Sequence, residues 1–319
     1  MLKRLKIIST LLLLLAVACG GPRGKKAAPS TRAFPKVTVP EAYTDQQDRV
    51  EYTCSHYWDG YLAGTGQTDS AFVLGVKRGE LEQALSNYIA ILGMAPLKDA
   101  QKCVAKFFEG VCEVQRRDTL SQFYTQFTQM VADYLYNPNS PMRDEDLYLP
   151  FVQGLAESPL TREDMRPAYR YEAMVCALNQ RGTIAPDFSA RKMDGSVFTL
   201  HGISAPYTLL FFSNPGCGSC KEIISQINSQ FGEMVDNGGL AVVNIYIDDQ
   251  INDWYEYIQH YPEKWYNGYD YKFVIRNEVL YDVRAIPSLY LLDAEKRILA
   301  KDAPLEKIIA LLSRQGANE

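Results

Sequence analysis

Two cysteines, Cys217 and Cys220, have the type and spacing that most directly predict chemistry. A separation of three residues places both side chains on one face of a helix with Cβ atoms about 5–6 Å apart, within reach of a disulfide. Cys217 lies nearer the expected helix N-terminus, where free backbone N–H groups and the helix dipole favour a thiolate. The pattern predicts a reversible pair with Cys217 as the nucleophile and Cys220 as the resolving thiol. Lys221 either lowers the thiol pKa further or is simply solvated.

The residues around the pair predict a strand, a break and a helix. Residues 207–212 form an apolar run of strand length, Pro215 and Gly216 interrupt it, and apolar residues then recur at helical spacing. Tetrahedral zinc takes four ligands, and the sequence has neither a second Cys-x-x-Cys nor histidines at ligand spacing. An inert structural disulfide is the other alternative. The strand-to-helix setting favours redox activity without a metal or cofactor.

A second stretch supports the redox interpretation. Pro287 stands directly before an apolar strand at 289–292, where a proline is otherwise awkward. Residues 184–314 as a whole resemble the thioredoxin fold, specifically its TlpA/ResA-like envelope branch. The motifs that carry the resemblance are IAPDF, MDGSVFTL, CGSC and AIPS, at residues 184–188, 193–200, 217–220 and 285–288.

The resemblance implies an α/β thioredoxin fold in which the peptide bond before Pro287 is cis. It also implies that Ile286, Pro287 and Gly216 contact substrate chains beside Cys217. The implied activity is disulfide exchange with the thiols and disulfides of envelope proteins, and a redox partner must recharge the cysteine pair. The family favours reduction of the client, but the same atoms serve the reverse reaction, so the sequence leaves the direction open.

The resemblance is incomplete at four positions. The family commonly has Trp before the first cysteine and often Pro before the second, where this chain has Gly216 and Ser219. The family also has an acid on the preceding strand or on the following helix, where this chain has Phe211 and Ile223. Glu222 is adjacent, but one helical step of about 100° turns it away from Cys220. No residue can therefore be assigned as the proton acceptor for Cys220.

The N-terminus has the features of a secretory leader. Residues 1–18 combine a basic start, an apolar run and a small-residue exit, and they are too short to span a bilayer. The sequence LAVACG resembles a bacterial lipoprotein box, in which Cys19 becomes acylated, although the ordinary signal peptidase would cut at the same bond. The residues that follow Cys19 favour a lipid anchor in the outer membrane of a Gram-negative envelope, with the chain facing the periplasm.

Length and composition predict two soluble globular domains. The chain has 319 residues, 47% hydrophobic and 22% charged, and its net charge of −5 argues against a nucleic-acid partner. Residues 19–40 are rich in Gly, Pro and basic residues and are typical of a flexible tether. We expect an all-α helical domain at 41–180, ahead of a thioredoxin-like domain at 181–319.

The helical domain resembles an uncharacterised domain that precedes thioredoxin domains in Gram-negative envelope lipoproteins. Its first helix should begin at a capping box of Thr44 and Gln47, and NPNSP at 137–141 should form an exposed turn. Its many tyrosines are better explained as core than as a docking surface. Further helices are expected at 78–93, 97–116, 119–136, 144–157 and 161–180, the last closed by Gly182.

Four more cysteines lie in this domain: Cys54, Cys103, Cys112 and Cys176. Cys103 and Cys112 are nine residues apart on one expected helix, about 13 Å along its axis, which is too far for a disulfide. Cys54 and Cys176 lie on apolar stripes and are favoured as buried free thiols. Whether any of the four forms a disulfide stays open.

Two further features of the second domain could bear on its site. Asp248 and Asp249 end an apolar strand at 240–247, and capping of the helix expected at 251–258 is favoured over a metal or acid role. Residues 261–280 are expected to be a turn-rich insertion that either walls the site or covers the sheet.

Two functions of different classes follow from these patterns. The first is a thiol-disulfide oxidoreductase that acts on envelope proteins through Cys217 and Cys220. The alternative is a partner-binding lipoprotein whose cysteine pair is vestigial, and the missing buried acid and tryptophan favour it. A peroxidase is disfavoured, because the residues around Cys217 lack the Pro and Thr arrangement that peroxiredoxins use to hold peroxide.

Overall fold

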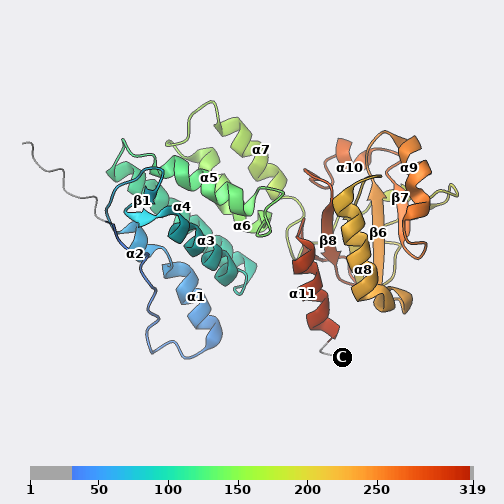
Figure 1. Cartoon of the computed structure of the whole chain (residues 1–319), viewed down its shortest axis with the longest axis horizontal. Helices are drawn as coiled ribbons and strands as arrows, with labels where there is room; N and C mark the ends of the chain where they lie inside the picture. The colour runs from blue at the N-terminus through green and yellow to red at the C-terminus, as the bar shows by residue number, and fades with distance from the viewer. Residues whose placement is uncertain (1–30, 317–319) are drawn as a thin grey trace, which may run out of the picture.

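The computed structural model describes residues 31–316, which form a helical unit and a sheet unit (Figure 1). The expected signal peptide at 1–18 and the lipidation site Cys19 lie outside the described residues. The expected fold class, an α/β half preceded by a helical half, is confirmed. The helical unit contains α1 Gln46–His56, α2 Asp59–Leu62, β1 Phe72–Val73, β2 Val76–Lys77, α3 Arg78–Leu92, α4 Leu97–Arg117, α5 Phe123–Leu135, α6 Glu145–Glu157 and α7 Arg166–Cys176.

Aromatic rings fill the centre of the helical unit. Trp58 stacks on Phe107 with ring centroids 4.5 Å apart, and Tyr61, Tyr88 and Phe127 pack around them, all buried. Buried aromatic side chains remove large apolar areas from water, which is the main stabilising contribution to such a core. The prediction that the tyrosines belong to the core is confirmed for Tyr61 and Tyr88.

The start of the helical unit differs from the prediction in two ways. Helix α1 is capped by Asp45, whose carboxylate accepts the N–H groups of Gln47 at 2.7 Å and Asp48 at 3.2 Å, and not by Thr44. A carboxylate suits this position because it also faces the positive end of the helix dipole. A two-stranded hairpin, β1 with β2, interrupts the segment expected to be helical throughout. Its strands are too short to show an alternating pattern.

Helix α7 is shorter than expected. It begins at Arg166 and ends at Cys176, so neither Thr161 nor Gly182 marks its ends. The Thr161 hydroxyl is instead 2.6 Å from the Tyr124 hydroxyl, within hydrogen-bonding distance. Thr161 therefore makes a tertiary contact and does not have the capping role that the sequence pattern predicts.

The described end of the expected tether, residues 31–40, lies against the helical unit. The Arg32 guanidinium donates to the carbonyls of Leu74 at 2.8 Å and Tyr61 at 2.7 Å. Phe34 stacks with Tyr61 at a centroid distance of 5.4 Å. These contacts make residues 32–34 part of the folded domain, and the tether prediction is wrong for them.

The sheet unit is built on a seven-stranded mixed sheet in the order β4-β3-β7-β6-β5-β8-β9. The interior strand β5 pairs in parallel with β6 and in antiparallel with β8. The strands are β3 Ser189–Arg191, β4 Val197–Thr199, β5 Tyr207–Phe212, β6 Leu240–Tyr246, β7 Tyr266–Tyr269, β8 Ser288–Leu292 and β9 Ile298–Ala300. Strand β7 joins the sheet within residues 261–280, so the expectation of a turn-rich insertion there is wrong.

Helices cover both faces of this sheet. Apolar residues of α8 Gly218–Asp236 and α11 Leu305–Gly316 pack on one face of β5, and α10 Val274–Asn277 packs on the other. Helix α9 Ile251–Tyr257 adjoins α8 through a small aromatic cluster. Figure 1 shows α8 and α11 in front of the sheet, with α11 nearest the helical unit. Among residues 31–316, no helix combines the length and apolarity needed to cross a membrane.

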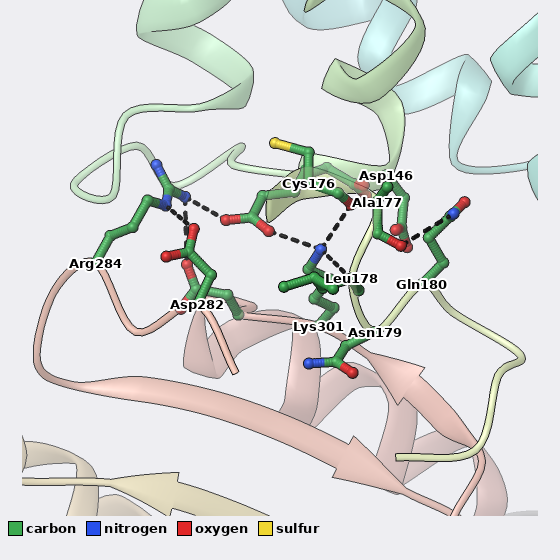
Figure 2. A network of polar contacts seen from close by, with 12 residues as sticks. Asp146, Cys176, Ala177, Leu178, Asn179, Gln180, Asp282, Arg284 and Lys301 are labelled. Carbon is green, nitrogen blue, oxygen red and sulfur yellow. Dashed lines mark hydrogen bonds and ion pairs between the residues drawn. The ribbon is translucent and has the colours of Figure 1, made fainter. Parts of the chain in front are cut away.

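Buried charges join the two units (Figure 2). The Lys301 ammonium, after β9, forms an ion pair with Glu145 Oε2 of α6 at 2.8 Å and donates to the Cys176 carbonyl at 2.8 Å and to the Leu178 carbonyl. The Arg284 guanidinium donates to Glu145 Oε1 at 2.6 Å. The carboxylate at the start of α6 thus pairs with two cations of the sheet unit, Lys301 and Arg284.

Candidate active site

The cysteine pair lies where the interior strand β5 is followed by a long helix. Strand β5 ends at Phe212 and α8 begins at Gly218, with Cys217 as its N-cap residue. Cys217 Sγ accepts the backbone N–H of Cys220 at 3.1 Å, and the two residues are joined by a disulfide with their Cα atoms 5.2 Å apart. The predicted pairing is therefore geometrically satisfied, and Cys217 lies one position before the first turn.

The two cysteines differ in exposure. Cys220 is 2% exposed and belongs to the apolar cluster between the sheet and α8, whereas Cys217 is only half-buried. Only Cys217 can be reached by an outside sulfur without movement of the backbone. The Cys220 N–H in the first turn of α8 donates to Cys217 Sγ, and a donor at the N-terminus of a helix favours the thiolate when the disulfide is open.

A polar bridge holds the loop before the cysteines. The Asn214 amide donates to Asp248 Oδ2 at 2.7 Å, and Arg276 of α10 donates to Asp248 Oδ1 at 2.5 Å. The Cys217 N–H donates in turn to the Asn214 carbonyl at 3.3 Å. The N-cap of α9, Gln250, has no side-chain cap, so the prediction that Asp248 or Asp249 caps this helix is wrong. Asp248 instead positions the loop that carries the nucleophile.

Gly216 supplies the turn into the helix. Its φ of +73° lies in the left-handed region, which residues with a Cβ adopt only with strain. This conformation lets the chain reverse between Pro215 and the N-cap at Cys217. Lys221 is exposed, and its ammonium lies 5.8 Å from the centroid of the Tyr257 ring. Nothing in this arrangement requires a role for Lys221 at the sulfur.

The proline segment lies beside the cysteines, as the resemblance implies. The Ile286–Pro287 peptide bond is cis. Phe212, the last residue of β5, is opposite Ser288, the first residue of β8. Pro287 therefore lies at the end of the sheet where β5 leads into the cysteine loop. Both Ile286 and Cys217 pack against the apolar cluster that contains Cys220. The structure thus brings together Cys217, Cys220, Ile286, Pro287 and Gly216.

A neutral polar network lies near the cysteines on the sheet. Ser213 Oγ donates to Asn244 Oδ1 at 2.5 Å and lies 3.3 Å from the Tyr261 hydroxyl, and the Asn244 amide donates to Asn267 at 3.0 Å. Asn244 is buried and pairs in register with Phe211. Burial raises the pKa of Tyr261. Sequence reasoning missed this network, although a polar residue within the apolar strand LAVVNIY was a usable signal.

A cleft of about 290 Å³ runs beside Pro287 and is shared by the two units. One wall comes from α8 through Ser219 and Glu222, and the opposite wall comes from the helical unit through Asn139 and Arg143. Sequence reasoning treated 137–141 as an exposed turn between helices. It could not show that this turn faces the cysteine helix, because the contact exists only in the tertiary structure.

No group of three or more His, Cys, Asp or Glu side chains is placed to hold a metal within residues 31–316. The candidate site consists of the disulfide, the cis-proline segment and the shared cleft.

Comparison with known proteins agrees with this geometry. Residues 206–298 match a family model described as thioredoxin-like, and residues 19–176 match one described as a domain of unknown function, DUF5106. A search of the curated proteins gives no match. The C-terminal domain of an uncharacterised protein from Bacteroides fragilis NCTC 9343 is 40% identical, over 42% of this chain and 98% of that one, with a TM-score of 0.41. A domain of a possible thiol-disulfide isomerase from Cytophaga hutchinsonii ATCC 33406 is 24% identical, over 44% and 97%, with a TM-score of 0.38.

Both units together are similar to a solved structure. It is a thioredoxin-like protein from Bacteroides caccae ATCC 43185, 33% identical, with a TM-score of 0.73. The match covers 88% of this chain and 98% of the other, so it includes the helical unit as well as the sheet unit. The chain therefore belongs to the same family of thioredoxin-like proteins, with a DUF5106 domain ahead of the thioredoxin-like domain.

Proposed function

We propose that the protein is a thiol-disulfide oxidoreductase that exchanges disulfides with proteins of the cell envelope. One observation carries the proposal: a half-buried Cys217 caps a helix next to a cis-proline, and its disulfide partner Cys220 is buried behind it. This arrangement separates an attacking thiol from a resolving thiol, which is what stepwise exchange requires.

In the reducing direction, the Cys217 thiolate attacks one sulfur of a client disulfide and expels the other client sulfur as a thiolate. A mixed disulfide then joins Cys217 to the client. The Cys220 thiolate attacks Cys217 Sγ, which forms the intramolecular disulfide and releases the second client thiolate. The client gains two electrons and two protons, and a partner dithiol must return them to the cysteine pair. Oxidation of a client follows the same steps in reverse.

The shared cleft is the proposed binding site for the client chain. Ile286 and Pro287 line it on the sheet unit, and Asn139 and Arg143 line it on the helical unit. A client segment next to its cysteine would lie along the cis-proline segment and contact the helical unit as well. The helical unit would then select among clients in addition to carrying the redox domain.

The sequence supports an envelope location for this activity. The leader at 1–18 and the lipoprotein box at Cys19 motivate a lipid anchor, an outer-membrane position and exposure to the periplasm. Metabolic labelling with a fatty acid, followed by Cys19→Ser, tests this directly. Label that persists in the variant would exclude this anchor.

The activity is tested with insulin reduction by the full chain. Cys217→Ser should remove the insulin reduction that this pair carries out, and Cys112→Ser, which removes a buried cysteine of the helical unit, should leave the rate unchanged. Equal rates in Cys217→Ser and the parent would refute the proposed nucleophile. Cys220→Ala should accumulate mixed disulfides through Cys217, and the trapped chains would identify the clients.

A second candidate is a partner-binding protein with a weak cysteine pair. Phe211, a buried apolar residue, occupies the position where the resemblance implies an acid, and the polar network near it is neutral. This candidate predicts no insulin turnover and only non-covalent partners for Cys220→Ala.

A further inference from the structure

The helical unit contains a second pair of cysteines that face one another. Cys54 lies on α1 and Cys103 on α4, and both line one cavity of about 650 Å³. The other two free cysteines lie apart from this cavity. Cys112 Sγ is 3.9 Å from Ser158 Oγ, and Cys176 is buried at the end of α7.

Helix packing brings Cys54 and Cys103 to the same level. Trp58 follows Cys54 by four residues and Phe107 follows Cys103 by four, and these two rings stack at 4.5 Å. Residues four apart share a helix face, and Tyr57 and Trp58 keep helical backbone angles beyond α1. Each cysteine therefore lies one turn before a member of the stacked pair.

A second contact fixes the same register. The Lys106 ammonium, one turn after Cys103, donates to the carbonyl of Ser55 at 2.6 Å, next to Cys54. It also lies 3.0 Å from Asp59 Oδ1. With both contacts in place, Cys54 and Cys103 lie near enough for each thiol to shift the pKa of the other.

The two thiols differ in the same way as the pair in the sheet unit. Cys54 is 2% exposed, as is Cys220, and Cys103 is half-buried, as is Cys217. The neighbouring Cys54 thiol and the charge of Lys106 lower the pKa of Cys103, whereas the neighbouring Cys103 thiol and burial raise the pKa of Cys54. Cys103 is therefore the better nucleophile, and it faces the cavity.

We propose that Cys54 and Cys103 form a second redox couple, whose substrate is a disulfide of another polypeptide. The Cys103 thiolate attacks one sulfur of that disulfide and expels the other as a thiolate. Cys54, losing its proton to solvent, then attacks Cys103 Sγ and releases the second thiolate. One disulfide forms as another is reduced, with two electrons transferred. The couple does not involve Cys217 or Cys220, so it is independent of the proposed function.

The test uses the full chain with Cys217→Ser and Cys220→Ser, equilibrated in graded mixtures of reduced and oxidised dithiothreitol. After acid quenching, free thiols are alkylated and the chain is cut with trypsin. We expect fragment 50–77, which contains Cys54, to be joined to fragment 103–106 at the oxidising end and to be free at the reducing end. Alkylated cysteines in both fragments at every mixture, or a link from Cys54 to Cys112, would overturn the proposal.

A pulse of iodoacetamide on the reduced, folded parent chain supplies a second measurement. Cys103 in fragment 103–106 should be labelled at least about tenfold faster than Cys112 in 107–116 or Cys176 in 171–181, because only Cys103 combines partial exposure with a lowered pKa. Equal labelling of the three cysteines would overturn the assignment of Cys103 as the attacking thiol. Neither measurement requires a substituted cysteine in the helical unit, so a folding defect cannot obscure the result.

Discussion

Replacing Lys301 with methionine should separate the two units thermodynamically. The Lys301 and Glu145 side chains are each 2% exposed and 2.8 Å apart, and Lys301 also binds the carbonyls of Cys176 and Leu178. Lys301→Met keeps the side-chain volume but leaves one carboxylate oxygen and two carbonyls without this donor. Loss of one member of a buried ion pair costs about 3–5 kcal/mol. This loss weakens the contact between the helical unit and the sheet unit. We therefore expect a single cooperative unfolding transition in the parent and two transitions in the variant.

Urea unfolding followed by far-UV circular dichroism and by tryptophan fluorescence measures the effect, since Trp58 and Trp265 report on different units. The matched control is Lys264→Met. Lys264 forms a similarly short ion pair with Asp236, but the two side chains are 64% and 57% exposed, and such pairs contribute about 0–1 kcal/mol. If Lys301→Met and Lys264→Met shift the unfolding free energy equally, the buried network does not hold the units together and the reasoning is refuted.

Three further predictions concern the site and its surroundings. Burial raises the pKa of Asp302 from 3.8 to about 6, so between these pH values the folded chain holds a proton that the unfolded chain releases. The free energy of unfolding should therefore fall by about 3 kcal/mol as the pH rises from 3.8 to about 6. Asp302→Asn should flatten this pH dependence in urea unfolding, and an unchanged slope would contradict the raised pKa of Asp302. Asn139→Trp should narrow the shared cleft and lower kcat/KM for insulin by about tenfold. Reduction of a small aromatic disulfide should stay unchanged, and an equal loss of kcat/KM on both substrates would point to a folding defect. Gly216→Ala should cost about 1 kcal/mol in thermal unfolding because of the left-handed backbone, whereas Gly218→Ala, with ordinary angles and open space, should not.

Strand β5 and the cysteine helix α8 could be predicted because local sequence alone determines them. The apolar run at 207–212 coincides with β5, and the breakers Pro215 and Gly216 lie in the loop before α8. A strand buried on both faces is apolar along most of its length, and a helix start needs a break before it. The cis-proline segment could also be placed, but only because the resemblance supplied it.

Elements that depend on distant partners were not predictable. Strand β7 contains Gly268 and two tyrosines and has no apolar alternation, and it is a strand because β6 pairs with it over four residues. Asp248 was assigned to the next helix in the chain, whereas its partners are Asn214 and Arg276, each 28 or more residues away. Short polar residues cap and bridge equally well, so local sequence does not distinguish these roles.

The contacts of Asp302 connect the domain interface to the redox site. Its carboxylate accepts a hydrogen bond from the hydroxyl of Ser288, the residue after Pro287, at 2.7 Å. The same carboxylate lies 3.6 Å from Arg143, which also donates to the Asp302 backbone carbonyl at 2.7 Å. Arg143 belongs to the helical wall of the cleft, and Pro287 belongs to the opposite side. One buried carboxyl therefore binds both sides of the proposed client site. A change that undocks the helical unit must also release this contact to the cis-proline segment. Lys301→Met should for that reason slow insulin reduction, although Lys301 does not line the cleft, and Lys264→Met should not.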